Sequence, residues 1–306
     1  MNLRRTLVAP LAAAALAAAV LPAVPAAAAA DAPIAFATTV NGDPADVYAP
    51  APSDIRADLP VALLLQGANV SRSAYAQYAR AVAGYGFVVV VPDHHRVIFG
   101  QSGLFPEGVQ ASWTVDWART EDARAASPLK GRIDTGSLVL LGHSFGGAAA
   151  LTLTTGVCSP PFCGAPVPAP AELKGAALFG TNNTPPGGTV NPPVANTVPV
   201  ALVQGTADGM AAPAAAEGTY AAIQSPPKML VSVTGANHYG ITDTQNPAGA
   251  APDPSAQTVS QETSVKASAR WSAMFLRTVL GDVWSGVWLW GIGDAVDHAV
   301  TVRYDR

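Results

Sequence analysis

Short apolar runs alternate with helical patterns along most of the chain. Residues 61–65 and 87–91 are continuous apolar runs, as in strands that are buried on both faces of a parallel sheet. Further short runs of this kind occupy residues 138–141, 176–179, 200–203 and 229–233. Helices are predicted between the runs, at residues 73–83, 115–126 and 148–153, after Asp208, and at residues 258–280. Because parallel strands need crossover connections, this alternation predicts one doubly wound α/β domain.

Other segments depart from this alternation. Residues 34–40 and 45–48 flank Asn41-Gly42-Asp43, a turn composition, so an antiparallel pair is predicted ahead of the parallel strands. Two stretches rich in Pro and Gly, residues 159–172 and 181–197, are interpreted as loops above the sheet, because a strand resumes promptly after each.

The first 30 residues have the composition of a signal peptide. Arg4 and Arg5 precede an apolar stretch at residues 7–21, and a run of small residues ends at Ala30, where cleavage is predicted. The protein is therefore expected to be secreted, by the general or the twin-arginine route; an uncleaved membrane anchor is the alternative. No later segment approaches the length of a membrane span, so no stable insertion is expected after cleavage.

The remainder is expected to divide into a catalytic domain at residues 31–281 and a Trp-rich extension at residues 282–306. Trp284 and Trp288 are four residues apart, a spacing that puts both on one helical face, so the extension is predicted to dock against the domain. An exposed aromatic patch that binds a polymer surface is the alternative interpretation.

Composition narrows the possible partners. Charged residues are 12% of the chain, the formal net charge is −4, and no basic run could follow a phosphate backbone, so nucleic acid is excluded as an expected partner.

The two cysteines, Cys158 and Cys163, are predicted to form a disulfide in an oxidising compartment. No metal site is expected, since further Cys or His ligands are missing beside them. Oligomeric state is left open.

The strongest chemical signal is Gly142-His143-Ser144-Phe145-Gly146, placed between an apolar strand and an Ala-rich helix. This motif puts its serine on a sharp strand-to-helix turn that the flanking glycines permit. Ser144 is therefore the candidate nucleophile, and His143 is interpreted as a packing residue beneath the turn.

A serine hydroxyl needs a base, and the base needs a carboxylate that orients it. Asp208 and His238 follow the predicted strands at 200–203 and 229–233, in the chain order that such sites use. Both are expected at the carboxyl edge of the sheet. Asp243 is a competing carboxylate, ranked lower because it follows the histidine and ends no strand.

Two backbone N–H groups are expected to bind a developing oxyanion. One belongs to Phe145 and the other to Ala68, in the turn that Gly67 permits; Asn69 is the alternative donor if the turn is shifted by one residue. Substrate contacts are expected from Gly67, Asn69, Phe99 and Tyr239. Phe99 lies in an apolar segment, residues 97–113, interpreted as a flap or as packing over the sheet edge.

Adjacent Asp93, His94 and His95 follow a strand at the same edge. Neighbouring residues on an extended chain point to opposite faces and converge poorly on one ion, so a loop or a pocket wall is expected there.

These motifs resemble those of the α/β-hydrolase superfamily. The nucleophile motif, Gln66-Gly67-Ala68, Gly205-Thr206-Ala207-Asp208 and Asn237-His238 are similar to those of secreted bacterial relatives of dienelactone hydrolase, chlorophyllase, platelet-activating-factor acetylhydrolase and the cutinases, over about residues 55–280. The resemblance implies a mostly parallel sheet of about eight strands flanked by helices. Cutinase-like enzymes usually carry an aromatic residue where this chain has Ala68, which disfavours a polyester substrate.

The expected function is a secreted serine esterase that needs no cofactor and acts on a small-molecule or polymeric ester. The low charge favours short-to-medium acyl or aromatic esters. The alternatives are a cutinase-like polyester hydrolase, an amidase or peptidase on the same residues, and a noncatalytic binding protein that keeps the fold.

Overall fold

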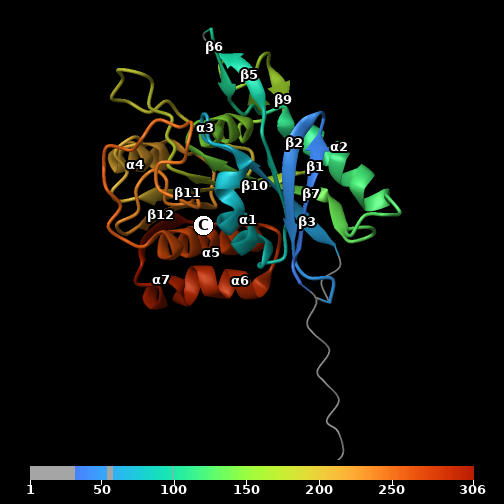
Figure 1. Ribbon diagram of the computed structural model, residues 1–306. Coiled ribbons are helices and arrows are strands. Elements are labelled where there is room, and N and C mark those ends of the chain that lie inside the picture. Colours follow the sequence, from blue (N-terminus) through green and yellow to red (C-terminus); the bar gives the residue numbers. More distant parts are fainter. Residues whose placement is uncertain (1–31, 54–57, 99) are drawn as a thin grey trace, which may run out of the picture. The chain divides into compact units, whose positions relative to one another are not determined.

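A mixed sheet forms the centre of the protein. The computed structural model describes residues 32–53, 58–98 and 100–306. Within these residues, nine strands form the sheet (Figure 1), in the spatial order β1 (Ile34–Val40), β2 (Asp43–Ala49), β4 (Val88–Pro92), β3 (Leu59–Leu65), β7 (Ile133–His143), β10 (Leu173–Phe179), β11 (Val200–Gly205), β12 (Lys228–Val233) and β13 (Val300–Asp305). The predicted signal peptide lies outside the described residues.

The six neighbouring strands β4, β3, β7, β10, β11 and β12 run parallel. β2 is antiparallel to its neighbour β4, and β13 is antiparallel to its neighbour β12. β1 and β2 form the predicted antiparallel pair. The prediction of an α/β-hydrolase fold with a mostly parallel sheet is therefore confirmed. The sheet has one strand more than expected, because the C-terminal extension contributes β13.

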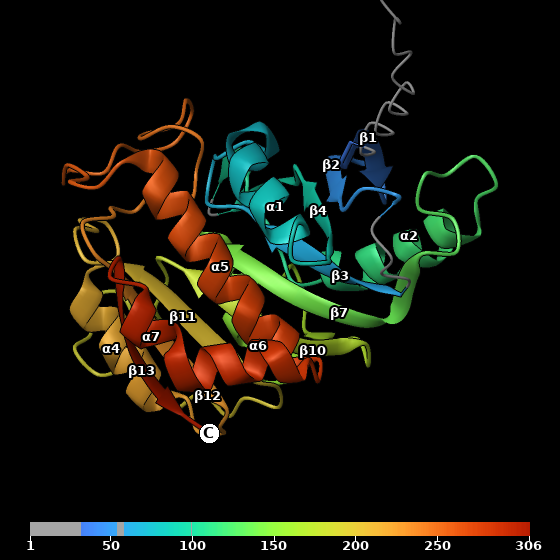
Figure 2. The ribbon, with the colours of Figure 1, turned by 90° about the horizontal axis from the view of Figure 1, so that it is seen from below.

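Side chains of the central strands pack on both faces of the sheet. In β3, Val61, Leu63 and Leu65 point into one apolar cluster, and Ala62 and Leu64 point into the other. Helices α2 (Gln110–Ala123), α3 (Ser144–Leu153) and α4 (Pro213–Ala222) cover the first face. The short helix η1 (Arg72–Tyr75) leads into α1 (Ala76–Ala83), which covers the second face with α5 (Gln261–Val279) (Figure 2). Two helical layers explain why these strands have no polar face.

The C-terminal extension packs through a different face than its sequence suggests. It forms α6 (Val283–Val287), the π-helix η2 (Trp288–Ile292) and α7 (Gly293–Val296) before β13. Trp288 packs against Trp271 with ring centroids 4.8 Å apart, whereas Trp284 is 82% exposed. The expectation of a shared Trp284–Trp288 packing face is therefore wrong, because Ser285 and Leu289 are the buried residues at that four-residue spacing.

Two small strand pairs lie outside the main sheet. The hairpin of β5 (His95–Ile98) and β6 (Gln101–Leu104) overlaps the start of the segment interpreted as a flap, residues 97–113. A second pair joins β8 (Val157–Cys158) and β9 (Val167–Pro168). None of the helices in the described residues is both long enough and apolar enough to span a bilayer.

Candidate active site

Ser144 lies at a sharp turn between β7 and α3. Its φ of 52° is in the left-handed region, which a residue with a side chain adopts only where its surroundings enforce it. The enforcement comes from close packing, since a Cβ on Gly146 would clash with the carbonyl oxygens of Leu65 and Gln66. The helix therefore begins directly against the end of β3, and its first N–H groups are left without helical partners.

Asp208 and His238 form a buried hydrogen-bonded pair beyond the ends of β11 and β12. His238 Nδ1 lies 2.9 Å from Asp208 Oδ2, and the two side chains are 3% and 0% exposed. The other carboxylate oxygen accepts the N–H groups of Met210 and Ala211, at 2.9 and 2.7 Å, and Gln204 Nε2 donates to Oδ2. Asp208 therefore holds Nδ1–H of the imidazole, which leaves Nε2 as the basic nitrogen.

The turn that carries Ser144 contacts this pair through His143. The His143 and His238 rings are 4.9 Å apart, and His143 Nε2 donates to the His238 carbonyl oxygen at 2.8 Å. Ser144 is the next residue along the chain. In the described residues its hydroxyl makes no hydrogen bond, a common condition for a catalytic group before substrate binds.

Backbone geometry distinguishes between the two candidate oxyanion donors in the turn after β3. The Asn69 N–H donates to the Leu104 carbonyl at 2.8 Å, and the Asn69 side chain accepts the Leu104 N–H at 3.1 Å. The Ala68 N–H has no hydrogen-bond partner in the part of the chain that the structure describes. Ala68 and Phe145 thus each present a free N–H, whereas Asn69 attaches the β5–β6 hairpin to this turn.

A buried chain of hydrogen bonds connects this turn to His238. The Gly67 N–H donates to the Tyr75 hydroxyl at 2.8 Å, and that hydroxyl lies 2.8 Å from His143 Nδ1. Because a carbonyl oxygen can only accept, the bond from Nε2 to His238 fixes the tautomer of His143, and Tyr75 must donate to Nδ1. Burial holds the pKa of His143 well below its usual range and raises the pKa of Tyr75. His143 is therefore neutral and does more than fill space.

Tyr75→Phe is expected to lower kcat by up to about 100-fold, because the Gly67 N–H loses its acceptor and the neighbouring Ala68 N–H shifts. Tyr78→Phe is the matched control, since the buried Tyr78 hydroxyl donates to Ser272 on α5, away from the turn after β3. Both variants should lose a similar stability, about 1–3 kcal/mol. Measurements of kcat and thermal unfolding for both variants test this. Equal kcat values for the two variants would contradict a positioning role for Tyr75.

Asp253 joins the loops that carry Asp208 and His238. Its carboxylate accepts the His238 N–H at 2.7 Å and the Gly209 N–H at 3.2 Å, and the residue is 7% exposed. Sequence reasoning missed Asp253, whose only signal is its place in a breaker-rich stretch after His238. It holds the two loops at a fixed separation.

The remaining carboxylate and histidine candidates have other partners. Asp243 accepts the Gln77 N–H at 2.9 Å at the start of α1, and burial raises the pKa of this carboxyl. His94 lies between Asp43 and Glu107, at 2.8 and 3.2 Å. No group of three or more potential metal ligands occurs among residues 32–53, 58–98 and 100–306.

Of the residues expected to contact substrate, Phe99 lies outside the described residues. Gly67 is buried and Asn69 is half-buried, both in the turn after β3. Tyr239 is 2% exposed and its hydroxyl donates to the Ala251 carbonyl, so it packs beside His238 within the fold. Phe105, from the flap segment, packs on Phe145 with ring centroids 5.7 Å apart.

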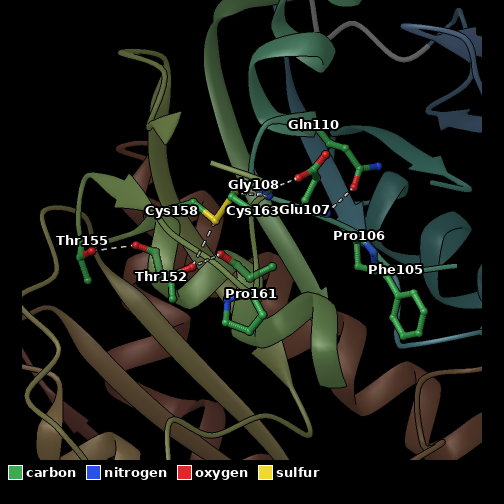
Figure 3. The surroundings of a disulfide bond; sticks show 12 residues. Phe105, Pro106, Glu107, Gly108, Gln110, Thr152, Thr155, Cys158, Pro161 and Cys163 are labelled. Carbon is green, nitrogen blue, oxygen red and sulfur yellow. Dashed lines mark hydrogen bonds between the residues drawn. A yellow bond between two sulfur atoms is a disulfide. The ribbon is translucent and has the colours of Figure 1, made fainter. Parts of the chain in front are cut away.

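The predicted disulfide between Cys158 and Cys163 is present and lies beside α3. Figure 3 shows Gly108 and Glu107 on one side of it and Thr152 and Thr155 on the other. The Gly108 N–H donates to Cys163 Sγ at 3.1 Å, and Thr152 Oγ1 lies 3.5 Å from Cys158 Sγ. The disulfide closes the loop that carries Phe162, whose ring packs on Phe145 with centroids 5.2 Å apart.

A mostly parallel sheet with a strained serine turn, and with polar side chains at its carboxyl edge, defines a hydrolase of the α/β-hydrolase type. The family model described as Chlorophyllase matches residues 28–183, slightly more than half of the chain. The chain belongs to the chlorophyllase family, a family of ester hydrolases. Among curated proteins, none matches the chain.

Proposed function

We propose that the protein is a serine hydrolase that cleaves carboxylic esters through an acyl-enzyme on Ser144. The observation that carries this proposal is the buried Asp208–His238 pair, connected through His143 to the strained turn at Ser144. Membership of the chlorophyllase family supports ester hydrolysis as the reaction.

In this mechanism, His238 Nε2 removes the proton of the Ser144 hydroxyl as its oxygen attacks the acyl carbon. Asp208 keeps the imidazole in the required tautomer and stabilises its cation. The N–H groups of Ala68 and Phe145 bind the oxyanion of the tetrahedral intermediate, each contributing about 2.7–4 kcal/mol to the transition state. His238 then protonates the leaving alcohol, and water hydrolyses the acyl-enzyme with the same base.

Labelling by a fluorophosphonate tests this proposal. The reagent reacts with a serine only where a neighbouring base activates it, so one equivalent is expected on the peptide that contains Ser144. Mass spectrometry of the labelled protein, before and after digestion, gives the stoichiometry and the position. Absence of labelling at Ser144 would favour the noncatalytic alternative.

Matched ester and anilide substrates with the same acyl group separate an esterase from an amidase on these residues. We expect the ester to be hydrolysed and the anilide to react far more slowly. Comparable initial rates on the two substrates would contradict the assignment.

We also propose that the protein is secreted after removal of residues 1–30. The Cys158–Cys163 disulfide supports an oxidising compartment. N-terminal sequencing of the protein recovered from culture medium would identify the cleavage position.

A further inference from the structure

A cavity of about 550 Å³ lies beside the nucleophile helix, a size within the usual range of ligand pockets. Its walls are α3, the loop closed by the disulfide, and the loop that follows β10. The lining residues on α3 and at its end are Ala148, Leu151, Thr152 and Thr155.

Both long walls of the cavity lead back to the candidate site. Ala148 and Leu151 follow Ser144 by four and seven residues, so they continue along the same face of α3, about 6 and 10 Å from it. The opposite wall begins at Asn182, two residues after Gly180, where a Cβ would lie 3.1 Å from His238 Nδ1. Both walls of the cavity therefore continue from the segments that hold Ser144 and pack against His238.

The residues that line the cavity suit an uncharged, apolar ligand group. Val157, Phe162 and Val194 contribute with four prolines of the loop after β10. The hydroxyls of Thr152 and Thr155 donate to the carbonyls of Ala149 and Thr152. None of the described residues that line the cavity carries a charge, so an ionised group placed there would lack a partner.

The walls are held in place without a ligand. The disulfide fixes the loop that carries Phe162, and Phe162 both lines the cavity and packs on Phe145, the residue after Ser144. Across the cavity, Asn191 Nδ2 donates to Asn183 Oδ1 at 2.6 Å and to Thr184 Oγ1 at 3.0 Å. These bonds connect the two arms of the loop, so hydrocarbon binding needs little reorganisation.

We infer that this cavity binds a hydrocarbon chain of the ester substrate, an inference that rests on the proposed function. The substrate class is an uncharged ester in which either the acyl or the alcohol part carries a chain of several carbons. Shorter esters leave the cavity empty and lose the free energy of apolar burial.

Two substrate series identify which part enters. One varies the acyl chain of p-nitrophenyl esters from acetate to dodecanoate, and the other varies the alcohol of acetate esters from ethyl to dodecyl. In the series whose variable part occupies the cavity, kcat/KM is expected to rise with chain length by about tenfold or more.

Variants that fill the cavity test its role. Ala148→Phe, near the nucleophile, is expected to lower the ratio of kcat/KM for octyl-length over two-carbon substrates by about tenfold or more. Thr155→Trp, farther along the wall, should lower the ratio only for the longest chains. Ala165→Trp is the control, since Ala165 is exposed on the neighbouring segment and does not line the cavity; its ratios should match those of the wild type.

Binding of uncharged N-phenyl-1-naphthylamine to Ser144→Ala gives a readout that needs no catalysis. Its fluorescence enhancement should disappear on adding Ala148→Phe and persist on adding Ala165→Trp. Unchanged ratios in both series, with probe binding unaffected by either cavity variant, would overturn this inference while leaving the proposed function intact. Full activity of Ser144→Ala would instead overturn the proposed function, whatever the probe shows.

Discussion

Ser144→Ala is expected to lower kcat for p-nitrophenyl acetate by about 10⁶-fold, because the reaction then has no nucleophile and only binding and the oxyanion donors remain. His238→Ala should cost about as much, since an unactivated hydroxyl reacts poorly. The double variant should be no worse than either single one, because the two groups act as a unit.

Steady-state and burst kinetics on freshly purified variants measure these effects. Ser73→Ala, an exposed serine at the start of η1, is the matched control and should retain wild-type activity. A double variant that is far less active than both single ones would contradict a shared proton-transfer step.

Asp208→Asn is expected to lower kcat by about 10⁴-fold with little effect on folding. The amide oxygen can still accept the N–H groups of Met210 and Ala211, which the carboxylate binds now. The amide nitrogen would then face His238 and donate to Nδ1, which forces the hydrogen onto Nε2 and removes the basic nitrogen.

Asp243→Asn is the control that separates the two carboxylates. Because Asp243 caps α1, its replacement should lower the melting temperature with little change in kcat. Measurements of kcat and of the melting temperature for both variants show which carboxylate orients His238. A larger loss of kcat for Asp243→Asn than for Asp208→Asn would assign to Asp243 the carboxylate that orients His238.

The parallel strands were predictable because strands buried on both faces of a sheet appear in the sequence as continuous apolar runs, such as residues 61–65. The strand β13 also has a local signal, since Val300 and Val302 alternate with Thr301 and Arg303. A strand was not predicted here because the whole C-terminal segment was interpreted from the helical spacing of its tryptophans. The exposure of Trp284 could not be predicted because it depends on which face of α6 packs against α5, and that is set by tertiary contacts.

In the candidate site, too, some residues could be predicted from the sequence and others could not. Ser144, Asp208 and His238 could be nominated from one motif and two strand ends, because chain order and strand edges are visible in a sequence. Tyr75 and Asp253 could not, since their partners are 68 and 15 residues away and only the tertiary fold brings them together. The choice between Ala68 and Asn69 depended on one hydrogen bond to Leu104, which no local pattern reveals.

The position of β13 matters for anyone who shortens this protein. It covers one hydrogen-bonding edge of β12 (Lys228–Val233), a strand in which four of the six residues are apolar. Truncation at Asp282 would leave that backbone unpaired and open to strands of other molecules. Such a variant is expected to aggregate, so changed adsorption to a surface after truncation could not be attributed to the lost tryptophans.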